Sequence, residues 1–427
     1  MKIEPAVAVV GHVAVPGDKS ISHRALLIGT LCEGETHVRG FGRSGDTEST
    51  LAAVRALGVN VEDIADDELL VGGVGLRGLQ QPDAPIDCGN AGTLLRLLTG
   101  ILAGQRGRFE LTGDDSLCSR PMDRVAEPLS RMGAHIETTD GRAPLVVERS
   151  DVLQGIDYTL PVASAQVKSA LLLAGLNAQS TTTVREPAPT RDHTEVMLEA
   201  AGARVRRHPT SVSIEPASRL RLDEVTVPGD FSAAAPFLVA ATLLAGSELT
   251  VHDVGLNPRR TGLLDVLERM GARISIFNRR KLGGEWIGDI DIRSAELIGT
   301  EVTPSEVPLL VDELPLFALA AAFARGSSTV RGAGELRVKE TDRIETVTNA
   351  LRTLGVRMRA RDDGFEVRGV PSRPRGGSMR SNGDHRVAML GAIAGLVSRE
   401  GVEVGEAEAV AISFPGFFQL LDSVSRR

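Results

Sequence analysis

Helical segments that are apolar on almost every side are the clearest pattern along this chain. Residues 170–174, 236–241 and 316–321 contain only alanine, leucine, valine, phenylalanine and proline. A helix without a polar face is stable where it is buried, so we expect these helices to lie inside the fold. The strands that follow them are expected to form sheets on the outside.

The buried helices belong to a longer pattern that occurs six times. In each copy a polar turn leads into a helix, a Gly-x-Thr-type strand, a polar loop, a second helix and another strand. The spacing of roughly 70–85 residues exceeds that of solenoid repeats, so each copy is predicted to be a βαβαββ-type subdomain. A glycine follows the second helix in five copies, as expected for a left-handed helix cap. The copies begin near Lys19, Gly89, Ser164, Pro228, Asp312 and Asp384.

Two similar turns divide the repeats into two groups of three. Pro16-Gly17-Asp18 and Pro228-Gly229-Asp230 each begin one group, and a chain of 427 residues is too long for one ordinary core. We expect one domain over residues 18–227 and a second formed by residues 1–17 with 228–427. The predicted fold class is α/β, a two-domain inside-out α/β barrel with buried parallel helices and outer sheets in each domain.

The start of the first helix also carries candidate chemistry. Pro16-Gly17 is a turn signal and the apolar run from Ile21 indicates a helix, which places Lys19, Ser20 and Arg24 on its first turns. Free backbone N–H groups and the positive dipole end of a helix favour anions. Two cations and a hydroxyl would complete a socket for a carboxylate or phosphate. The alternative is a capped helix with a solvated lysine and arginine.

Polar residues recur at two places in most of the other repeats, the start of the buried helix and the loop before the second helix. Because the buried helices point the same way, these places would meet at one anion-attracting end. Cations predominate, as a site for two polyanionic small molecules requires, and a few carboxylates remain for proton transfer. These candidates are Lys19, Arg24, Gly92, Arg96, Arg120, Ser164, Gln166, Lys168, Arg191, Asp312, Lys339, Glu340, Arg343 and Arg386. The alternatives are a buried ion pair for Arg96, a helix cap for Ser164 and a structural partner for Lys168.

Composition narrows the classes of function. A net charge of −8 and an aromatic content of 3% disfavour nucleic-acid binding, which favours basic and stacking surfaces. We find no nucleotide-binding glycine loop, nucleophile elbow or clustered His and Cys ligands, and we expect neither a metal nor a cofactor. Three scattered cysteines, no signal peptide and no apolar run of about 18 residues predict a cytoplasmic protein with reduced thiols and no membrane partner.

Seven motifs follow one another in order along nearly the whole chain. They lie at residues 16–24, 89–93, 120–122, 164–169, 337–343, 384–386 and 413–417. Each motif is weak by itself, but together they resemble the 5-enolpyruvylshikimate-3-phosphate synthase family. The resemblance implies two domains of three repeats with inward helices and outward sheets. We expect the site in the cleft between them, and we expect the cleft to close when ligand anions neutralise the like-charged helix ends that face each other across it. It implies transfer of the enolpyruvyl group of phosphoenolpyruvate to the 5-hydroxyl of shikimate 3-phosphate, with loss of phosphate from a tetrahedral intermediate. We expect these two small molecules as the only partners of a monomer.

The same resemblance implies a role for each matching residue. The residues expected to bind shikimate 3-phosphate, mostly in the 18–227 domain, are Lys19, Ser20, Arg24, Ser164, Ala165, Gln166, Arg191, Asp312 and Lys339. Those expected to bind phosphoenolpyruvate are Lys19, Gly92, Arg120, Gln166, Arg343 and Arg386. Asp312 is the expected base on the 5-hydroxyl, Glu340 the expected proton donor to the methylene carbon, and Lys19 assists.

Features that point in opposite directions leave the response to glyphosate open. Some members carry a lysine before the Ser/Thr-Phe-Pro segment, where this chain has Ile412. Together with residues 164–166 and 191–194, this resembles the less glyphosate-sensitive branch. Gly92, however, is the small residue associated with the sensitive form.

Alternative functions stay open at this point. The UDP-N-acetylglucosamine enolpyruvyl transferases share fold and chemistry, but are expected to have Lys-Asn in place of Lys19-Ser20. They also carry a reactive cysteine several residues before their Arg-Pro pair, whereas Cys118 stands two residues before Arg120. A non-catalytic anion-binding protein on the same fold is disfavoured by intact Lys19, Asp312 and Glu340. An RNA-end-processing enzyme is disfavoured by charge and aromatic content.

Overall fold

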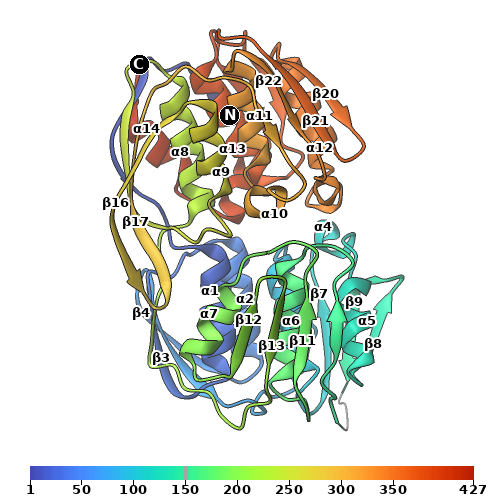
Figure 1. The fold of residues 1–427 in the computed structure, drawn as a ribbon. Coiled ribbons are helices and arrows are strands. Elements are labelled where there is room, and N and C mark those ends of the chain that lie inside the picture. Colours follow the sequence, from blue (N-terminus) through green and yellow to red (C-terminus); the bar gives the residue numbers. More distant parts are fainter. Residues whose placement is uncertain (149–151) are drawn as a thin grey trace. The chain divides into compact units, whose positions relative to one another are not determined.

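The structure, a computed structural model, describes residues 1–148 and 152–427 and divides the chain into two compact units (Figure 1). One contains Gly17–Val227 with Leu282–Glu285, and is called the 17–227 unit. The other contains Met1–Pro16, Pro228–Lys281 and Trp286–Arg427, and is called the 228–427 unit. The sequence-based division placed Gly17 and residues 282–285 in the other domain. The latter form the tip of a β-hairpin and pack with the 17–227 unit.

The described residues of the 17–227 unit form three four-stranded sheets and seven helices. The helices are α1 (Lys19–Thr30), α2 (Gly45–Ala56), α3 (Gly92–Leu102), α4 (Asp115–Cys118), α5 (Asp123–Arg131), α6 (Ala165–Gly175) and α7 (His193–Ala200). The sheet orders are β14-β3-β5-β4, β6-β7-β9-β8 and β10-β11-β13-β12. The strands are β3 (Glu33–Arg39), β4 (Asn60–Ala65), β5 (Glu68–Val74), β6 (Ile86–Asp87), β7 (Arg108–Thr112), β8 (His135–Thr139), β9 (Arg142–Glu148), β10 (Asp157–Thr159), β11 (Thr182–Arg185), β12 (Val205–His208), β13 (Ser211–Ile214) and β14 (Glu224–Thr226).

The 228–427 unit is built from the same parts. Its helices are α8 (Phe231–Leu243), α9 (Gly262–Met270), α10 (Val307–Leu310), α11 (Leu314–Phe323), α12 (Arg343–Thr353), α13 (His385–Val397) and α14 (Phe417–Val424), with short helices η1 (Gly334–Val338) and η2 (Ala407–Ile412). The sheet orders are β16-β17-β15-β2-β24, β18-β19-β21-β20 and β1-β23-β22. The strands are β1 (Lys2–Ile3), β2 (Ala8–Ala14), β15 (Glu248–Gly255), β16 (Arg273–Leu282), β17 (Glu285–Arg293), β18 (Glu301–Val302), β19 (Gly326–Val330), β20 (Arg357–Arg361), β21 (Gly364–Gly369), β22 (Gly377–Arg380), β23 (Val402–Gly405) and β24 (Ser425–Arg426).

Strand pairing confirms the predicted repeats. The pairs β6–β7, β10–β11 and β18–β19 are parallel, and each pair is joined through a buried helix, which makes a βαβ crossover. Two antiparallel strands complete each of these sheets. In the first and fourth repeats the leading strand is exchanged: β2 precedes α1 but pairs with β15, and β14 precedes α8 but pairs with β3.

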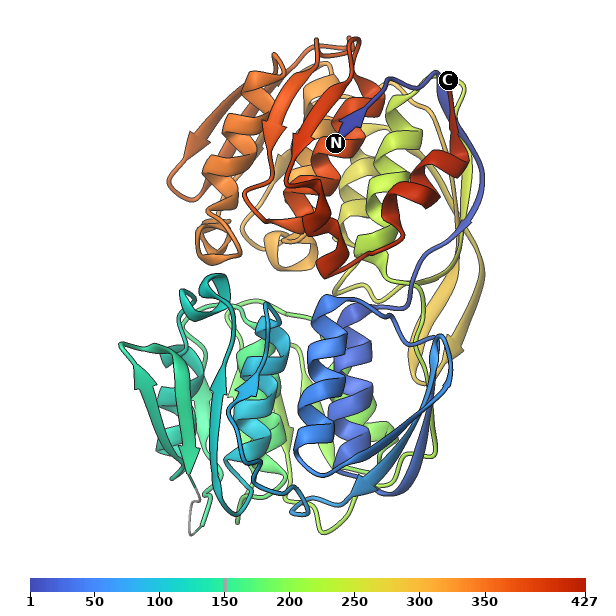
Figure 2. The same ribbon diagram turned by 180° about the vertical axis from the view of Figure 1, so that it is seen from behind.

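The apolar helices are buried, as predicted. Every residue of α13 and nearly every residue of α8 and α11 is buried, and these three helices contact one another. In the other unit α3 contacts both α1 and α6. Figures 1 and 2 show the helices of each unit running side by side with strands along their outer faces. The predicted α/β class with inner helices and outer sheets is therefore confirmed.

Glycines end the second helices, as the pattern predicted. Gly58, Gly133, Gly202, Gly271 and Gly355 have φ between 85° and 103°, the left-handed conformation that favours glycine at this position. The predicted reduced cysteines are also found: Cys32 and Cys88 are buried free thiols and Cys118 is a half-buried one. Within the described ranges, no helix has both the length and the hydropathy needed to cross a bilayer.

Candidate active site

The first turn of α1 presents two of the predicted site residues. Asp18 caps the helix by accepting the backbone N–H of Ile21 at 2.9 Å, so Lys19 and Ser20 are its first two residues. The Lys19 ammonium donates to Asp46 Oδ2 at 2.6 Å. Asp46 was not predicted, and it fixes the half-buried Lys19 at the anion-attracting end of the helix.

Arg24 lies one turn further along α1 and is buried. Its Nη1 donates to the Ser20 carbonyl at 2.7 Å and its Nε to Thr194 Oγ1 at 2.6 Å. Burial lowers the pKa of Arg24 to about 10; the Glu195 carboxylate opposes this effect and the Arg191 charge adds to it. Arg24 therefore stays charged at neutral pH, and it lies within electrostatic range of Arg191 from the third repeat.

The N-termini of α3 and α6 hold a second group of predicted residues. Arg96 Nη1 donates to Gln166 Oε1 at 3.0 Å, and Arg120 Nη2 donates to Asn90 Oδ1 at 2.7 Å. A side chain at Gly92 would place its Cβ 2.8 Å from Arg96 Nη1 and 3.1 Å from Arg120 Nη1. Gly92 thus leaves room for two guanidinium groups at the start of α3, and Arg96 bonds to an amide in addition to backbone carbonyls.

The start of α6 carries the other residues predicted from the third repeat. Ser164 accepts the backbone N–H of Val167 at 3.4 Å, which makes it the N-cap, and the half-buried Ala165 and Gln166 begin the helix. The alternative interpretation of Ser164 as a cap is confirmed. Such a cap satisfies one of the four N–H groups that have no intrahelical partner at a helix N-terminus, so this end can still attract an anion.

Lys168 is a structural residue, as the alternative interpretation held. Its side chain is fully buried, and its ammonium pairs with Glu186 at 3.0 Å and with Glu195 at 2.8 Å. Since a buried charge must be compensated, this triad ties α6 to α7 and to the segment between them.

In the 228–427 unit the predicted carboxylates and arginines come together. Arg343 Nη2 donates to Glu340 Oε2 at 2.6 Å, and Arg343 Nη1 to Asp312 Oδ1 at 3.4 Å. Arg386 Nη2 lies 3.8 Å from Asp312 Oδ2. Lys339 follows η1 directly and precedes Glu340. Four predicted residues from the fifth and sixth repeats therefore form one cluster, with Lys339 next to it in the chain.

Asp384 fixes the centre of this cluster. Arg343 donates from Nε to Asp384 Oδ2 at 2.7 Å and from Nη2 to Asp384 Oδ1 at 3.1 Å. This bidentate contact defines the orientation of the guanidinium group. Burial by itself would lower the pKa of Arg343, but the charges of Asp384 and Glu340 raise it above its ordinary value. Arg343 is therefore a permanent buried cation.

Arg260 belongs to the same cluster and was not predicted. It is 3% exposed and lies in the turn before α9, where its guanidinium contacts Asp312 at 3.5 Å and Glu313 at 3.4 Å. The loop before the second helix is the position that gave Arg120 and Arg191 in other repeats. Applying the same rule to the fourth repeat would have found it.

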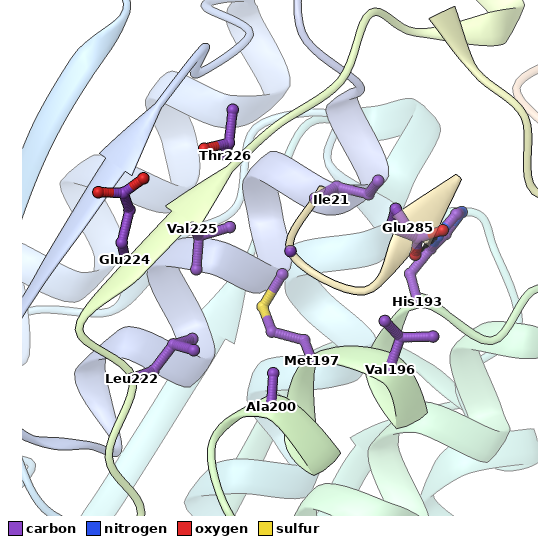
Figure 3. Close-up of a pocket in the computed structure, with 11 residues that line it drawn as sticks. Ile21, His193, Val196, Met197, Ala200, Leu222, Glu224, Val225, Thr226 and Glu285 are labelled. Atoms are coloured by element: carbon purple, nitrogen blue, oxygen red, sulfur yellow. Dashed lines mark hydrogen bonds and ion pairs between the residues drawn. The ribbon is translucent and has the colours of Figure 1, made fainter. Parts of the chain in front are cut away.

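A small pocket lies beside α1 and α7 in the 17–227 unit (Figure 3). His193 and Glu285 line it together, and His193 Nδ1 lies 2.7 Å from Glu285 Oε1. The remaining lining is mainly apolar: Ile21, Val196, Met197, Leu222 and Val225. At about 30 Å³ the pocket has room for water only. It is therefore too small for either predicted substrate.

The two groups of side chains differ in chemistry. The 17–227 unit offers Lys19, Arg24, Arg120 and Arg191 at or near helix N-termini, which suits anion binding. The 228–427 unit combines arginines with carboxylates, which suits both anion binding and proton transfer. Across the part of the chain that the structure describes, no group of three or more His, Cys, Asp or Glu side chains is arranged to hold a metal ion.

Solved structures resemble this chain over its whole length. An EPSP synthase from Acinetobacter baumannii is 42% identical with a TM-score of 0.88, covering 99% of this chain and 97% of the other. The enolpyruvyl transferase NikO from Streptomyces tendae is 19% identical with a TM-score of 0.80, covering 99% and 96%. The second likeness shows a shared fold only.

Curated relatives and a family model agree with the first likeness. The 3-phosphoshikimate 1-carboxyvinyltransferase of Alkalilimnicola ehrlichii is 50% identical over 98% of this chain and 94% of its own length. That of Acidithiobacillus ferrooxidans is 49% identical over 97% and 95%. The family model for EPSP synthase (3-phosphoshikimate 1-carboxyvinyltransferase) matches residues 3–421. The chain therefore belongs to the EPSP synthase family, whose members are 3-phosphoshikimate 1-carboxyvinyltransferases.

Proposed function

We propose that this chain transfers the enolpyruvyl group of phosphoenolpyruvate to the 5-hydroxyl of shikimate 3-phosphate. The reaction is the one that its family membership implies. It needs cations for two polyanionic substrates and carboxylates for proton transfer. The observation that carries the proposal is the convergence of Asp312, Glu340, Arg343 and Arg386 in one charged cluster.

Shikimate 3-phosphate is assigned mainly to the 17–227 unit. Ser20 and Arg24 take its carboxylate, and Lys19 touches both substrates. The phosphate is held at the start of α6 by Ser164, Ala165 and Gln166. Two cations, Arg191 and Lys339, bind it as well. Free N–H groups at a helix N-terminus support this assignment.

Phosphoenolpyruvate is assigned to the arginines. Arg120, Arg343 and Arg386 clamp its phosphate and carboxylate, because a guanidinium presents two parallel N–H donors to such groups. The backbone at Gly92, the Gln166 amide and the Lys19 ammonium complete the set. The close approach of Arg96 and Arg120 to Gly92 supports its inclusion.

Two carboxylates then perform the proton transfers. Asp312 takes the proton of the 5-hydroxyl, whose oxygen bonds to the central carbon of phosphoenolpyruvate, while Glu340 protonates the methylene carbon with help from Lys19. Loss of a methyl proton and of phosphate from the tetrahedral intermediate gives the product. Glu340 now accepts a hydrogen bond from Arg343. When substrate anions bind to Arg343, this hydrogen bond to Glu340 weakens. The charged form of Glu340 is then less stabilised, and Glu340 takes up a proton more easily.

Phosphate release tests the proposal directly. Purified protein is expected to release phosphate only when both phosphoenolpyruvate and shikimate 3-phosphate are present. UDP-N-acetylglucosamine as the acceptor tests the sister activity and is expected to give none. Asp312→Asn is expected to lower kcat by about 100- to 10,000-fold while the dissociation constant of shikimate 3-phosphate changes less than about threefold. Folded protein without release would reject the function.

We also propose that the chain works as a monomer in the cytoplasm. Each unit encloses its own hydrophobic core, so neither needs a second chain to bury its helices. Three free thiols fit a reducing compartment. Light scattering on purified protein and fractionation of cells test the two statements separately.

A further inference from the structure

The turn that carries Arg260 is held in place by its own backbone. It joins β15 to α9, and the N–H groups of Arg260 and Thr261 donate to the Asn257 carbonyl at 2.8 and 3.1 Å. The N–H of Arg259 donates to Asn257 Oδ1 at 2.9 Å. Arg260 therefore enters the charged cluster from a fixed turn, independently of the helices that carry Arg343 and Arg386.

Arg260 is enclosed by acceptors that belong to the protein. Its Nη2 donates to Asp230 Oδ1 at 3.3 Å and to Ser232 Oγ, both at the start of α8. Its Nη1 faces Glu313 Oε1 at 3.4 Å and Asp312 Oδ2 at 3.5 Å. Arg260 is 3% exposed, close to the 2% of Arg343, so these protein acceptors define where its guanidinium lies.

Among the described residues, Arg260, Arg343 and Arg386 face the Asp312 carboxylate, and they differ in the role assigned to them. Arg343 lies 3.4 Å from Oδ1, and Arg386 lies 3.8 Å from Oδ2. Both are assigned to phosphoenolpyruvate, so the substrate competes with Asp312 for their N–H groups. The neighbouring Glu313 and Glu340 are negative and favour protonation of Asp312. Arg260, in contrast, is assigned to neither substrate, and besides Asp312 it contacts Glu313, Asp230 and Ser232.

We propose that Arg260 is a positioning residue that keeps Asp312 ionised and oriented while phosphoenolpyruvate occupies Arg343 and Arg386. The inference rests on the proposed role of Asp312 as the base. It explains how Asp312 stays ready to accept a proton after the substrate has recruited Arg343 and Arg386, two of the cations that face it. Arg260 acts through Asp312 and does not itself touch the reacting atoms.

The test uses Arg260→Gln, which removes the charge, and Arg260→Lys, which keeps it. With both substrates saturating, the acid limb of the kcat–pH profile is expected to move to higher pH by about one unit in Arg260→Gln. The KM values should change less than about threefold. In Arg260→Lys kcat should fall by about tenfold with the limb unmoved, since the charge remains but the fork geometry is lost. Arg269→Gln removes an exposed charge from α9 and should match the wild type.

A titration that does not need turnover separates this inference from the proposed function. Isotope-labelled aspartate carboxyl groups are followed by NMR, and the Asp312 signal is assigned by its loss in Asp312→Asn. The Asp312 midpoint should rise in Arg260→Gln and stay in place in Arg269→Gln. If the wild type releases no phosphate, the proposed function fails while this titration still decides the role of Arg260. If the Asp312 midpoint in Arg260→Gln equals that of the wild type, the inference is overturned. If Arg260→Gln does not fold, an Arg260→Lys enzyme with unchanged kcat overturns it.

Discussion

The Lys19 ammonium and the Asp46 carboxylate form a 2.6 Å ion pair at the start of α1. Their side chains are 17% and 8% exposed, so the contact is shielded from solvent and fixes the lysine more firmly than a surface pair would. The proposed function assigns Lys19 to both substrates. Asp46 is therefore expected to matter for catalysis although it is not assigned to either substrate.

Asp46→Asn is expected to lower kcat about tenfold, or about 1.4 kcal/mol, because Lys19 loses the partner that orients it. The KM for shikimate 3-phosphate should change less than about threefold, because the poorer orientation of Lys19 and the rise in the net positive charge of the site have opposite effects on binding. A double-mutant cycle checks the cause. In a Lys19→Met background, Asp46→Asn should have almost no further effect, and full additivity would contradict the interpretation.

Gly92 makes a second prediction possible. An alanine Cβ would lie 2.8 Å from Arg96 Nη1 and 3.1 Å from Arg120 Nη1, so at least one guanidinium has to move. Gly92→Ala is expected to raise the KM for phosphoenolpyruvate about tenfold, with a smaller effect on kcat, because Arg120 belongs to the proposed clamp. Steady-state kinetics with varied phosphoenolpyruvate measure both. Gly416→Ala, where a Cβ meets nothing within 4 Å, is the matched control.

The buried triad of Lys168, Glu186 and Glu195 predicts a large loss of stability. Lys168→Met leaves two carboxylates without their buried cation, which is expected to lower the free energy of unfolding by about 3–5 kcal/mol. Urea denaturation with a signal from the 17–227 unit measures it. Arg131→Met breaks a pair with Glu127 that is more than half exposed and should cost less than about 1 kcal/mol. Equal losses in the two variants would contradict the structural role of Lys168.

Repetition explains how much of the site the sequence could predict. A helix start and a loop before the second helix recur in each copy, so Arg24, Arg120 and Arg343 could be placed at equivalent positions without a structure. The apolar helices and the capping glycines followed from periodicity alone. Arg260 obeys the same rule: it stands beside Arg259 in the loop before the second helix of the fourth repeat, and it was missed because the rule was not applied to that repeat.

The partners of these cations could not be predicted in this way. Asp46 stands 27 residues after Lys19, and no local pattern distinguishes it from the other carboxylates at helix starts. Likewise, the pairing of Arg343 with Asp384 depends on how α12 and α13 pack. Side-chain pairing across repeats is a property of tertiary structure, whereas the repeat positions are a property of the sequence.

His23 gives a prediction about pH. It is fully buried on α1, and burial, reinforced by the charges of Lys19 and Arg24, holds its pKa well below the ordinary value. The unfolded chain takes up a proton on this histidine below about pH 6.5, whereas the folded chain does not. Since the unfolded state then binds more protons, stability falls as the pH drops below that value, by up to about 1.4 kcal/mol per unit.

His23→Asn removes the contribution of this histidine to the pH dependence of stability. The asparagine amide can keep the contact with Thr50 that His23 Nδ1 makes at 2.6 Å. Between pH 6.5 and pH 5 the wild type should lose about 2 kcal/mol more of its free energy of unfolding than the variant. Urea denaturation at both pH values measures the difference, which cancels the carboxylate titrations common to the two proteins. His135→Asn, on the exposed end of β8, should behave as the wild type does. Parallel pH dependences for wild type and His23→Asn would show that the buried imidazole takes up a proton in the folded chain as readily as in the unfolded one.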